Sequence, residues 1–369
     1  MSGKDLKFAV LGTGNSGHAF AADIALKGFS VNMADLPPFK ANLDAIQEKG
    51  GIQISGEASE GFARLNLVTT DLEKAIKGVD IVIVGAPANA HEPYSRALAP
   101  YFEDDQFIVF ISNFGALRFK HWMKQLGVKA NVTPVETQSL IYATRSPQPG
   151  SVEVFGLKSD LPAAALPAGR TSEFLEKISP IFPQWTAAES ALFTSLNNLN
   201  PIVHPSMTLL NTGRIESTLG KGWSLYGDGA TESVAKVMEA MDDERMALAD
   251  LCQVTRISLK DSFALMYGHL GVKADTLSQL LRSSPIHANP ALPGTPASIH
   301  TRYLTEDVPF GLVPWSSMRR MWGVPTPTID AFIQIASIIE GVSYFEEGVT
   351  VKDMGIEGLS PEQVRGMVV

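Results

Sequence analysis

Strand-like apolar runs alternate with helix-like stretches through the first half of the chain. The runs lie at residues 8–11, 29–34, 80–85 and 107–112, with a shorter one at 131–136 that Pro134 weakens. The helix-like stretches lie at residues 16–27, 41–49, 71–77 and 115–126. Strands that are apolar along their whole length are typical of a parallel sheet covered on both faces. This order predicts an α/β fold of Rossmann type, a doubly wound parallel sheet that binds its ligand at the carboxyl ends of the strands.

Other segments alternate polar and apolar positions with period two, as half-buried strands do. Two hairpins are predicted from this pattern, at residues 52–55 with 62–67 and at residues 140–144 with 151–156. From residue 191 onward the spacing becomes helical, with helices expected at residues 190–212, 231–252, 258–267, 275–282 and 328–342. The predicted organisation is therefore a dinucleotide-binding domain over residues 1–190 and an all-α domain over residues 191–369. The loop at 283–300 is rich in proline, and a segment of that length without regular structure is usually functional or mobile.

A glycine motif directly after the first strand indicates a dinucleotide. In the pattern G-x-G-x-x-G the first glycine permits a tight turn, the second lets the backbone approach a pyrophosphate, and the third lets the helix pack close to the strand. An acidic residue that ends the second strand can accept hydrogen bonds from a ribose and repel a 2′-phosphate. NAD(H) is therefore the expected cofactor, with NADP(H) as the alternative. The residues expected to bind it are Gly12, Thr13, Gly14, Asn15, Ser16, Gly17 and Asp35.

Composition narrows the class of protein further. The 369 residues are 45% hydrophobic and 19% charged, which is ordinary for a globular protein. A net charge of −9 argues against a broad surface for nucleic acid or anionic membrane, since both would be repelled. The one cysteine, Cys252, lies in a helix-like stretch and is expected to be a buried thiol. There is no signal-peptide pattern and no apolar run of the ~18 residues that a membrane span requires, so a cytoplasmic location is expected.

A bound nicotinamide needs a partner that exchanges a proton and another that holds an anionic substrate. His204 lies in an apolar, helix-like stretch with three asparagines and two prolines, where it is either catalytic or a hydrogen-bonded core histidine. Arg302 could bind a carboxylate, and Asp307 could orient a histidine. The alternative for that pair is a surface ion pair or a helix cap. The other histidines show no metal-ligand spacing, so no metal site is expected.

Taken together, the motifs resemble the octopine/nopaline (opine) dehydrogenase family, and in particular its bacterial norvaline-type members. The matching segments are residues 12–22, 136–139, 144–150, 195–205, 208–211 and 301–314. The resemblance implies reductive condensation of a 2-oxo acid, often pyruvate, with the amino group of an amino acid or amine. It also implies that His204 is the catalytic histidine, Asp307 its partner and Arg302 the group that binds the substrate carboxylate. The sequence departs from the family at Asn113, where a Pro-Gly sequence is expected.

Two further expectations and two alternatives accompany this interpretation. Thr137 and Gln138 follow a strand end and are candidates for contact with substrate or nicotinamide, and the helical domain could support a homodimer. One alternative is a hydroxy-acid or ketopantoate-type dehydrogenase, which would rely on a lysine such as Lys221 and need no amine. The other is a dinucleotide-binding regulator without turnover, which would leave His204 and Asp307 unexplained.

Overall fold

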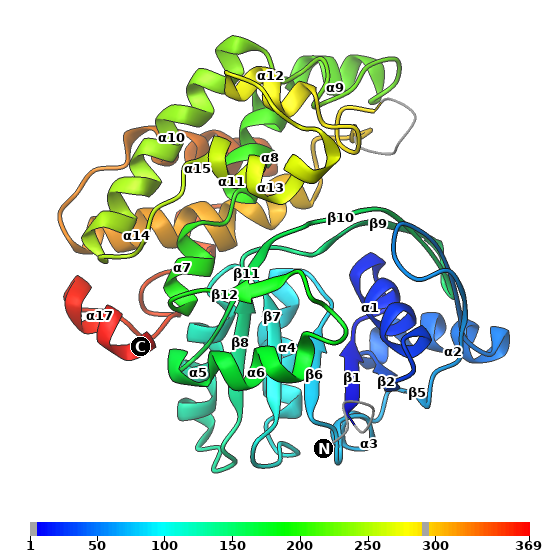
Figure 1. The fold of residues 1–369 in the computed structure, drawn as a ribbon. Coiled ribbons are helices and arrows are strands. Elements are labelled where there is room, and N and C mark those ends of the chain that lie inside the picture. Colours follow the sequence, from blue (N-terminus) through cyan, green and yellow to red (C-terminus); the bar gives the residue numbers. More distant parts are fainter. Residues whose placement is uncertain (1–5, 290–294) are drawn as a thin grey trace. The chain divides into compact units, whose positions relative to one another are not determined.

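The structure is a computed structural model that describes residues 6–289 and 295–369. It divides into two compact units, Met1–Thr194 with Val368–Val369, and Ser195–Met367, and each is described by itself. The fold class expected from the sequence is confirmed, because a mostly parallel sheet with helices is followed by a helical unit (Figure 1).

The N-terminal unit is built on an eight-stranded sheet in the order β12-β11-β8-β7-β6-β1-β2-β5. Its strands are β1 (Lys7–Leu11), β2 (Ser30–Ala34), β5 (Leu67–Thr69), β6 (Ile81–Val84), β7 (Phe107–Ile111), β8 (Thr133–Thr137), β11 (Leu161–Ala165) and β12 (Trp185–Ala187). Six neighbouring strands run parallel to one another, namely β8, β7, β6, β1, β2 and β5. The next strand, β11, is antiparallel to β8. Leu11 lies opposite both Ala34 and Val84, so β1, β2 and β6 end at the same edge. The order reverses between β1 and β6, which is the point where such sheets bind ligands.

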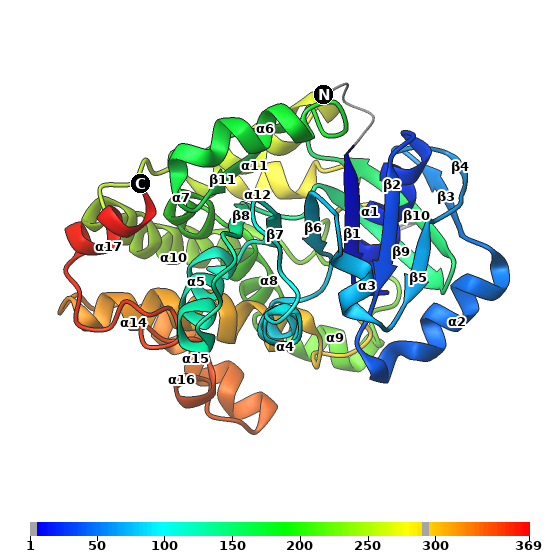
Figure 2. The same ribbon diagram turned by 90° about the horizontal axis from the view of Figure 1, so that it is seen from below.

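Helices cover both faces of this sheet (Figure 2). They are α1 (Asn15–Leu26), α2 (Lys40–Lys49), α3 (Leu72–Ile76), α4 (His91–Leu98), α5 (Gly115–Leu126) and α6 (Thr171–Ile178), with 3₁₀ turns at Pro37–Phe39, Ala88–Ala90 and Ala168–Arg170. Leu11, Val84 and Phe110 share one core cluster with Tyr94 of α4 and Trp122 of α5. No helix was predicted at α4, although a parallel connection from β6 to β7 needs a crossover segment of this kind.

A second sheet of four strands joins the two predicted hairpins. Its order is β4-β3-β10-β9, from β3 (Ile52–Gly56), β4 (Gly61–Ala63), β9 (Tyr142–Gln148) and β10 (Ser151–Leu157). Asp23, buried in α1, holds segments of both hairpins. It accepts hydrogen bonds from the Ser59 hydroxyl at 2.5 Å and the Tyr142 hydroxyl at 2.7 Å. The pairing of β3 with β10 joins residues about a hundred positions apart, which local spacing does not reveal.

In the described part of the C-terminal unit every regular element is helical. These elements are α7 (Ala191–Leu196, which begins before the division), α8 (Asn200–Leu209), α9 (Thr212–Thr218), α10 (Glu232–Leu251), α11 (Leu259–Tyr267), a 3₁₀ turn (Gly268–Leu270), α12 (Leu277–Arg282), α13 (Arg302–Thr305), a π-helical turn (Val308–Leu312), α14 (Val313–Met321), α15 (Pro327–Glu340), α16 (Tyr344–Glu347) and α17 (Pro361–Val368). Residues 290–294 of the predicted 283–300 loop lie outside the described residues.

The single helix predicted over residues 190–212 is wrong, because the helix breaks at residues 197–199. Arg245, which is fully buried in α10, stabilises the break. Its guanidinium donates to the Leu196 carbonyl at 2.7 Å and to the Asn197 side-chain oxygen at 2.9 Å, and it pairs with Asp242 at 2.7 Å. A buried cation requires such compensation, and here it binds a carbonyl that a continuous helix would have used internally.

The expectation of a buried Cys252 thiol is confirmed, and its burial raises its pKa to about 12. Trp122, Trp185, Trp223 and Trp315 are also buried. No helix among residues 6–289 and 295–369 combines the length and the apolarity that a membrane span needs.

Candidate active site

The glycine turn after β1 has the close backbone packing that its sequence indicates. Gly12 has φ +100°, a left-handed conformation that favours glycine. A Cβ on Gly17 would lie 1.8 Å from the Gly12 carbonyl oxygen, so no larger residue fits there. A Cβ on Gly14 would meet nothing within 4 Å, so the space over this residue is open. The turn therefore fits a pyrophosphate, with Gly14 as the point of approach.

The first turn of α1 presents backbone N–H groups that have no side-chain cap. The Asn15 side chain instead binds β9, because its oxygen accepts a hydrogen bond from the Ser146 N–H at 2.8 Å. His18 bridges the Gly14 carbonyl, at 2.9 Å from Nδ1, and the Gly150 N–H, at 3.0 Å from Nε2. Burial lowers the pKa of His18, so the ring is neutral and adds no charge to the turn. The helix N-terminus is thus the electropositive feature available to an anion.

Asp35 is buried at the end of β2 and already accepts four hydrogen bonds. Its carboxylate receives the Thr13 N–H and hydroxyl at 2.7 and 2.6 Å, the Leu36 N–H at 2.7 Å and the Tyr94 hydroxyl at 2.5 Å. Asn42 completes the network by donating to the Thr13 hydroxyl at 3.0 Å. Burial, then the Asp35 charge, raise the pKa of Tyr94, so its phenol stays protonated as the donor. Asp35 therefore ties the glycine turn to β2 and α4 as well as supplying a negative charge.

In the helical unit, folding brings His204 and Asp307 together from 103 positions apart. His204 Nδ1 lies 2.7 Å from Asp307 Oδ2, and the two side chains are 12% and 5% exposed. The carboxylate can only accept, so Nδ1 carries the proton of the neutral ring and Nε2 is the atom left to face a reactant. Asp307 precedes the π-helical turn Val308–Leu312, a type of local irregularity found frequently at functional sites.

Arg302 lies on α13, five positions before Asp307 in the sequence, and its side chain is 60% exposed. Its nearest described acid is Glu306, at 3.9 Å, a distance that leaves the guanidinium able to bind another carboxylate. Thr301 caps α13 by accepting a hydrogen bond from the Tyr303 N–H at 3.3 Å. The Tyr303 ring lies flat against His204, with ring centroids 4.1 Å apart and planes at 23°.

Thr137 and Gln138 lie at the end of β8 in the N-terminal unit, and both are buried. The Thr137 hydroxyl donates to the Ser139 carbonyl at 2.9 Å, and the Gln138 N–H donates to the Pro162 carbonyl at 2.8 Å. Beside them, buried Glu136 accepts from the Ala116 N–H at 3.2 Å, so it caps α5. The structure thus gives Thr137 and Gln138 contacts that hold the strand end.

Sequence reasoning missed three features of these regions. Tyr94 lies on the helix that was not predicted, and Tyr303 carried no signal other than its place next to Arg302. At the end of β7, Ser112, Asn113 and Phe114 all have left-handed backbones, with φ of 65°, 63° and 57°. Asn113 is where the sequence departs from the family pattern, and such strained residues cluster at functional sites.

No group of three or more His, Cys, Asp or Glu side chains in the described parts of the chain could hold a metal ion.

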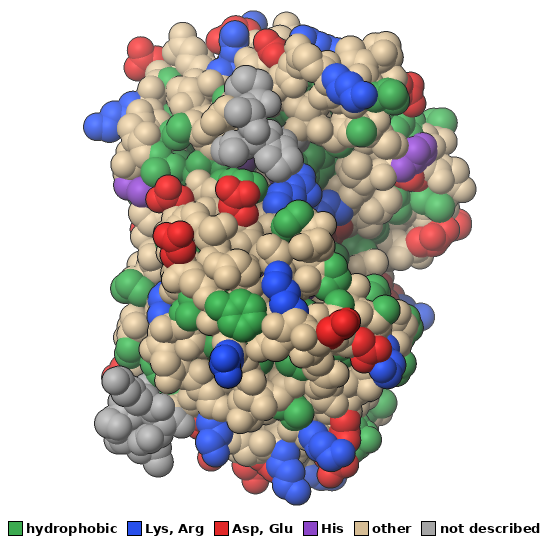
Figure 3. Space-filling view, turned by 90° about the vertical axis from the view of Figure 1, so that its right-hand side faces the viewer, with side chains coloured by type: hydrophobic (Ala, Val, Ile, Leu, Met, Phe, Trp, Pro, Cys, Tyr) green, Lys and Arg blue, Asp and Glu red, His purple; other side chains and the backbone are tan. Residues whose placement is uncertain are grey.

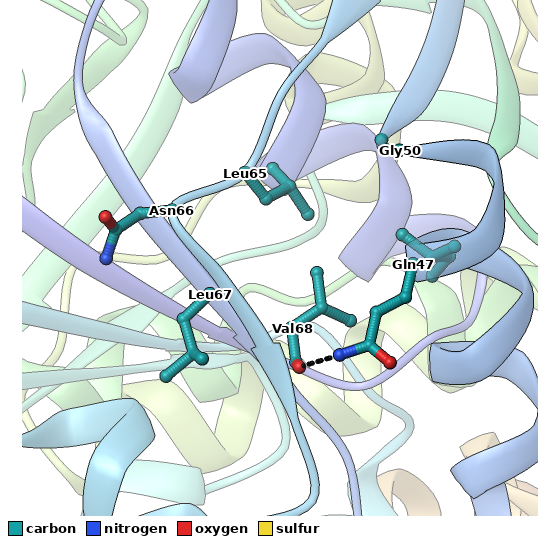
Figure 4. A pocket seen from close by; sticks show the side chains of 8 residues that line it. Gln47, Gly50, Leu65, Asn66, Leu67 and Val68 are labelled. Atoms are coloured by element: carbon teal, nitrogen blue, oxygen red, sulfur yellow. Dashed lines mark hydrogen bonds between the residues drawn. The ribbon is translucent and has the colours of Figure 1, made fainter.

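A hollow in the N-terminal unit is lined by the end of α2 and the start of β5 (Figure 4). There Gln47 Nε2 donates to the Val68 carbonyl at 2.6 Å. Val68 lies opposite Met33 of β2, and β5 is the edge strand, so this hollow lies at the edge of the sheet and away from the switch point between β1 and β6. On the face in Figure 3, acidic and basic side chains are interspersed.

A Rossmann-type unit with an open glycine turn, followed by a helical unit with a part-buried His–Asp pair, defines an NAD(P)-dependent oxidoreductase. Residues 187–340 match the family model described as NAD/NADP octopine/nopaline dehydrogenase, alpha-helical domain. The chain is 36% identical to an opine dehydrogenase of Arthrobacter sp. (strain 1C), over 98% of each chain. It is 29% identical to an octopine dehydrogenase of Mizuhopecten yessoensis, over 95% of this chain and 94% of that one. The chain therefore belongs to the opine dehydrogenase family.

A solved octopine dehydrogenase structure, described with NADH and L-arginine, has the same fold, with a TM-score of 0.77. It is 23% identical to this chain and covers 97% of each.

The two glycines of the turn make a matched pair of variants. Gly14→Ala adds a methyl group to open space, so we expect normal folding with NADH binding weakened about tenfold or more. Gly17→Ala forces the turn and α1 apart, so we expect a lower melting temperature as well as lost binding. Thermal unfolding and a fluorescence titration with NADH measure both effects. Equal melting temperatures for the two variants would contradict the packing role of Gly17.

Proposed function

We propose that this protein catalyses the NAD(P)H-dependent reductive condensation of a 2-oxo acid, in the first instance pyruvate, with the amino group of an amino acid or amine. The product is an opine-type secondary amine. The observation that carries the proposal is the 2.7 Å contact of His204 with Asp307, next to an exposed Arg302, in a helical unit that matches the family.

The reaction has two stages. The amine adds to the carbonyl carbon of the oxo acid and water leaves, which forms an imine protonated on nitrogen. NADH or NADPH, held at the glycine turn, would supply the hydride that the imine carbon accepts, which gives the neutral secondary amine. His204 Nε2 hands a proton to the carbonyl oxygen, so that the oxygen can leave as water. Asp307 accepts the Nδ1–H, holds the ring plane and stabilises the charged imidazolium from which that proton comes.

Arg302 orients the oxo acid. A guanidinium can bind a carboxylate through two parallel hydrogen bonds, which fixes both the distance and the rotation of the bound group. The bound acid then presents its carbonyl next to the His204 ring. Such fixed geometry is worth several orders of magnitude in rate, because the reacting groups no longer have to find one another.

We also propose that the protein prefers NADH, because Asp35 holds a negative charge beside the glycine turn. Four protein donors already bind its carboxylate oxygens. The preference for NADH over NADPH therefore depends more on the negative charge of Asp35 than on new hydrogen bonds to these oxygens. A 2′-phosphate placed near a buried carboxylate is strongly disfavoured in a low dielectric.

Several finer expectations belong to the same proposal. Thr137 and Gln138 contact the substrate or the nicotinamide, and Asn15 and Ser16 bind the cofactor phosphates through their backbone N–H groups. The protein is cytoplasmic and forms a homodimer, for which Ile335 and Ile338 on α15 are candidate contacts because they are 46% and 70% exposed.

The alternative is a dehydrogenase that reduces a single carbonyl substrate and relies on a lysine. Lys221, the residue that this alternative needs, is exposed in a turn between α9 and α10, and no hydrogen bond or ion pair of its side chain is found within the described chain. The family assignment and the His204–Asp307 pair both favour the reductive condensation.

The proposal is tested by following NADH oxidation with pyruvate, alone and with a panel of amino acids and simple amines. We expect oxidation only when both the oxo acid and an amine are present. The product, isolated from the most active pair, should be a secondary amine. Oxidation by an oxo acid without any amine would overturn the proposal in favour of the single-substrate alternative.

His204→Ala removes the proton-exchanging group and leaves the glycine turn untouched. We expect kcat to fall by at least ~10²-fold while NADH affinity stays within about twofold, the usual scale for acid–base catalysis. His300→Ala is the matched control, because that ring pairs with Glu340 on the surface and is 60% exposed. Near-normal turnover by the His204 variant would remove this residue from the mechanism.

Asp35→Ala removes the charge that discriminates between the cofactors. We expect NADH binding to weaken because the turn loses the two hydrogen bonds that Thr13 donates to Asp35, and NADPH binding to weaken much less because repulsion is lost at the same time. Titrations of both cofactors measure the ratio of their Kd values. Asp44→Ala serves as the control, since it removes a carboxylate from the exposed surface of α2. Equal losses for both cofactors would contradict the role of the charge.

A further inference from the structure

Tyr303 covers one face of the catalytic imidazole. The two ring centroids are 4.1 Å apart and the planes are inclined by 23°, so the rings are stacked. Tyr303 lies on α13 and His204 on α8, and Asp307 approaches the same imidazole at its Nδ1 atom. The imidazole is therefore held at one edge by a carboxylate and on one face by a phenol ring.

We propose that Tyr303 is a positioning residue for the reductive reaction: its ring fixes the plane of the His204 imidazole and favours the protonated form. The inference rests on the proposed function, because it assigns a task to the proton that His204 delivers. A single hydrogen bond through Nδ1 restrains the imidazole but still permits some rotation about the Cβ–Cγ bond, within the tolerance of the hydrogen-bond angle. A ring stacked on the face removes this rotation, so that Nε2 keeps one direction.

The charge argument follows from the electronic structure of the phenol ring. An aromatic face carries partial negative charge and attracts a cation that lies over it. Imidazolium is the form that donates the proton, and its side chain is 12% exposed, so solvent screens the attraction little. Tyr303 and Asp307 therefore act in the same direction, one through the face of the ring and one through its edge.

Other charged and titratable groups also lie around His204, and they act on the imidazole together with the Tyr303 ring. Arg302 and Glu306 lie on or next to α13, and Tyr226 interacts electrostatically with Tyr303 and Asp307. On the other helices packed against α8, the charged groups in ion pairs are Arg214 of α9 with Asp228, Asp242 with Arg245 on α10, and Asp330 and Glu340 of α15 with Arg320 and His300. These groups are unchanged by a substitution of Tyr303, so a comparison among Tyr303 variants isolates the ring.

Tyr303→Phe and Tyr303→Leu are the variants that test the proposal. Both cover the imidazole face and exclude water, but only phenylalanine offers an aromatic face. We expect the Phe variant to keep kcat within about threefold of the wild type. We expect the Leu variant to lose about tenfold or more in kcat, with NADH affinity unchanged, and the alkaline limb of its kcat/KM profile to move down by about half a pH unit. Tyr303→Met, studied in parallel, is a second non-aromatic replacement.

A measurement without turnover keeps this test separate from that of the proposed function. Titration of ¹⁵N-histidine-labelled protein by NMR, with the His204 signal assigned from His204→Gln, follows its protonation directly. A lower His204 pKa in the Leu and Met variants than in the Phe variant supports the proposal, even if no oxo acid and amine pair is turned over. Identical pKa and kcat values in the wild type and both non-aromatic variants would overturn it. A Phe variant as impaired as the Leu variant would also overturn it, because the hydroxyl would then be the active part.

Discussion

Backbone contact among three glycines determines the geometry on which cofactor binding depends. Gly12 follows β1, Gly17 lies in α1 and Gly85 follows β6, and their backbones meet without any side chain in between. A Cβ on Gly17 would overlap the Gly12 carbonyl oxygen, and a Cβ on Gly85 would lie 2.9 Å from Gly17. This contact places the start of α1 directly at the switch point of the sheet, where its unpaired N–H groups can bind a pyrophosphate.

Buried carboxylates connect this geometry to the rest of the molecule, and each is compensated by donors from distant segments. Asp35 receives hydrogen bonds from the glycine turn and from α4, and Asp23 receives them from both hairpins of the small sheet. Asp307 holds His204 in the helical unit. Burying such a charge costs free energy unless its partners are already in place. The same contacts that stabilise the fold therefore orient the groups that we assign to catalysis.

Local pattern was enough for most elements of the N-terminal unit, because apolar strands, amphipathic helices and glycine turns each have a characteristic spacing. It was not enough for α4, whose short sequence with a proline in its first turn has little helical signal. It also failed at residues 197–199, where the buried Arg245 competes with the helix for backbone carbonyls. His204, Asp307 and Arg302 were candidates from the sequence alone, but only the family resemblance favoured functional roles for them over structural ones. Tyr94 and Tyr303 were not selected, since an isolated tyrosine carries no spacing signal.

The sequence by itself determined the fold class, the glycine turn and the kinds of chemistry available, since these depend on neighbouring residues and on the conformations that glycine alone adopts. Only the tertiary structure decided which distant residues meet. It joined two separate hairpins into one sheet, saturated Asp35 with four donors, and placed Asp307 and Tyr303 on the edge and face of His204. The physical reason is that burial demands a partner for each polar group, and the partner is chosen by packing and not by distance along the chain.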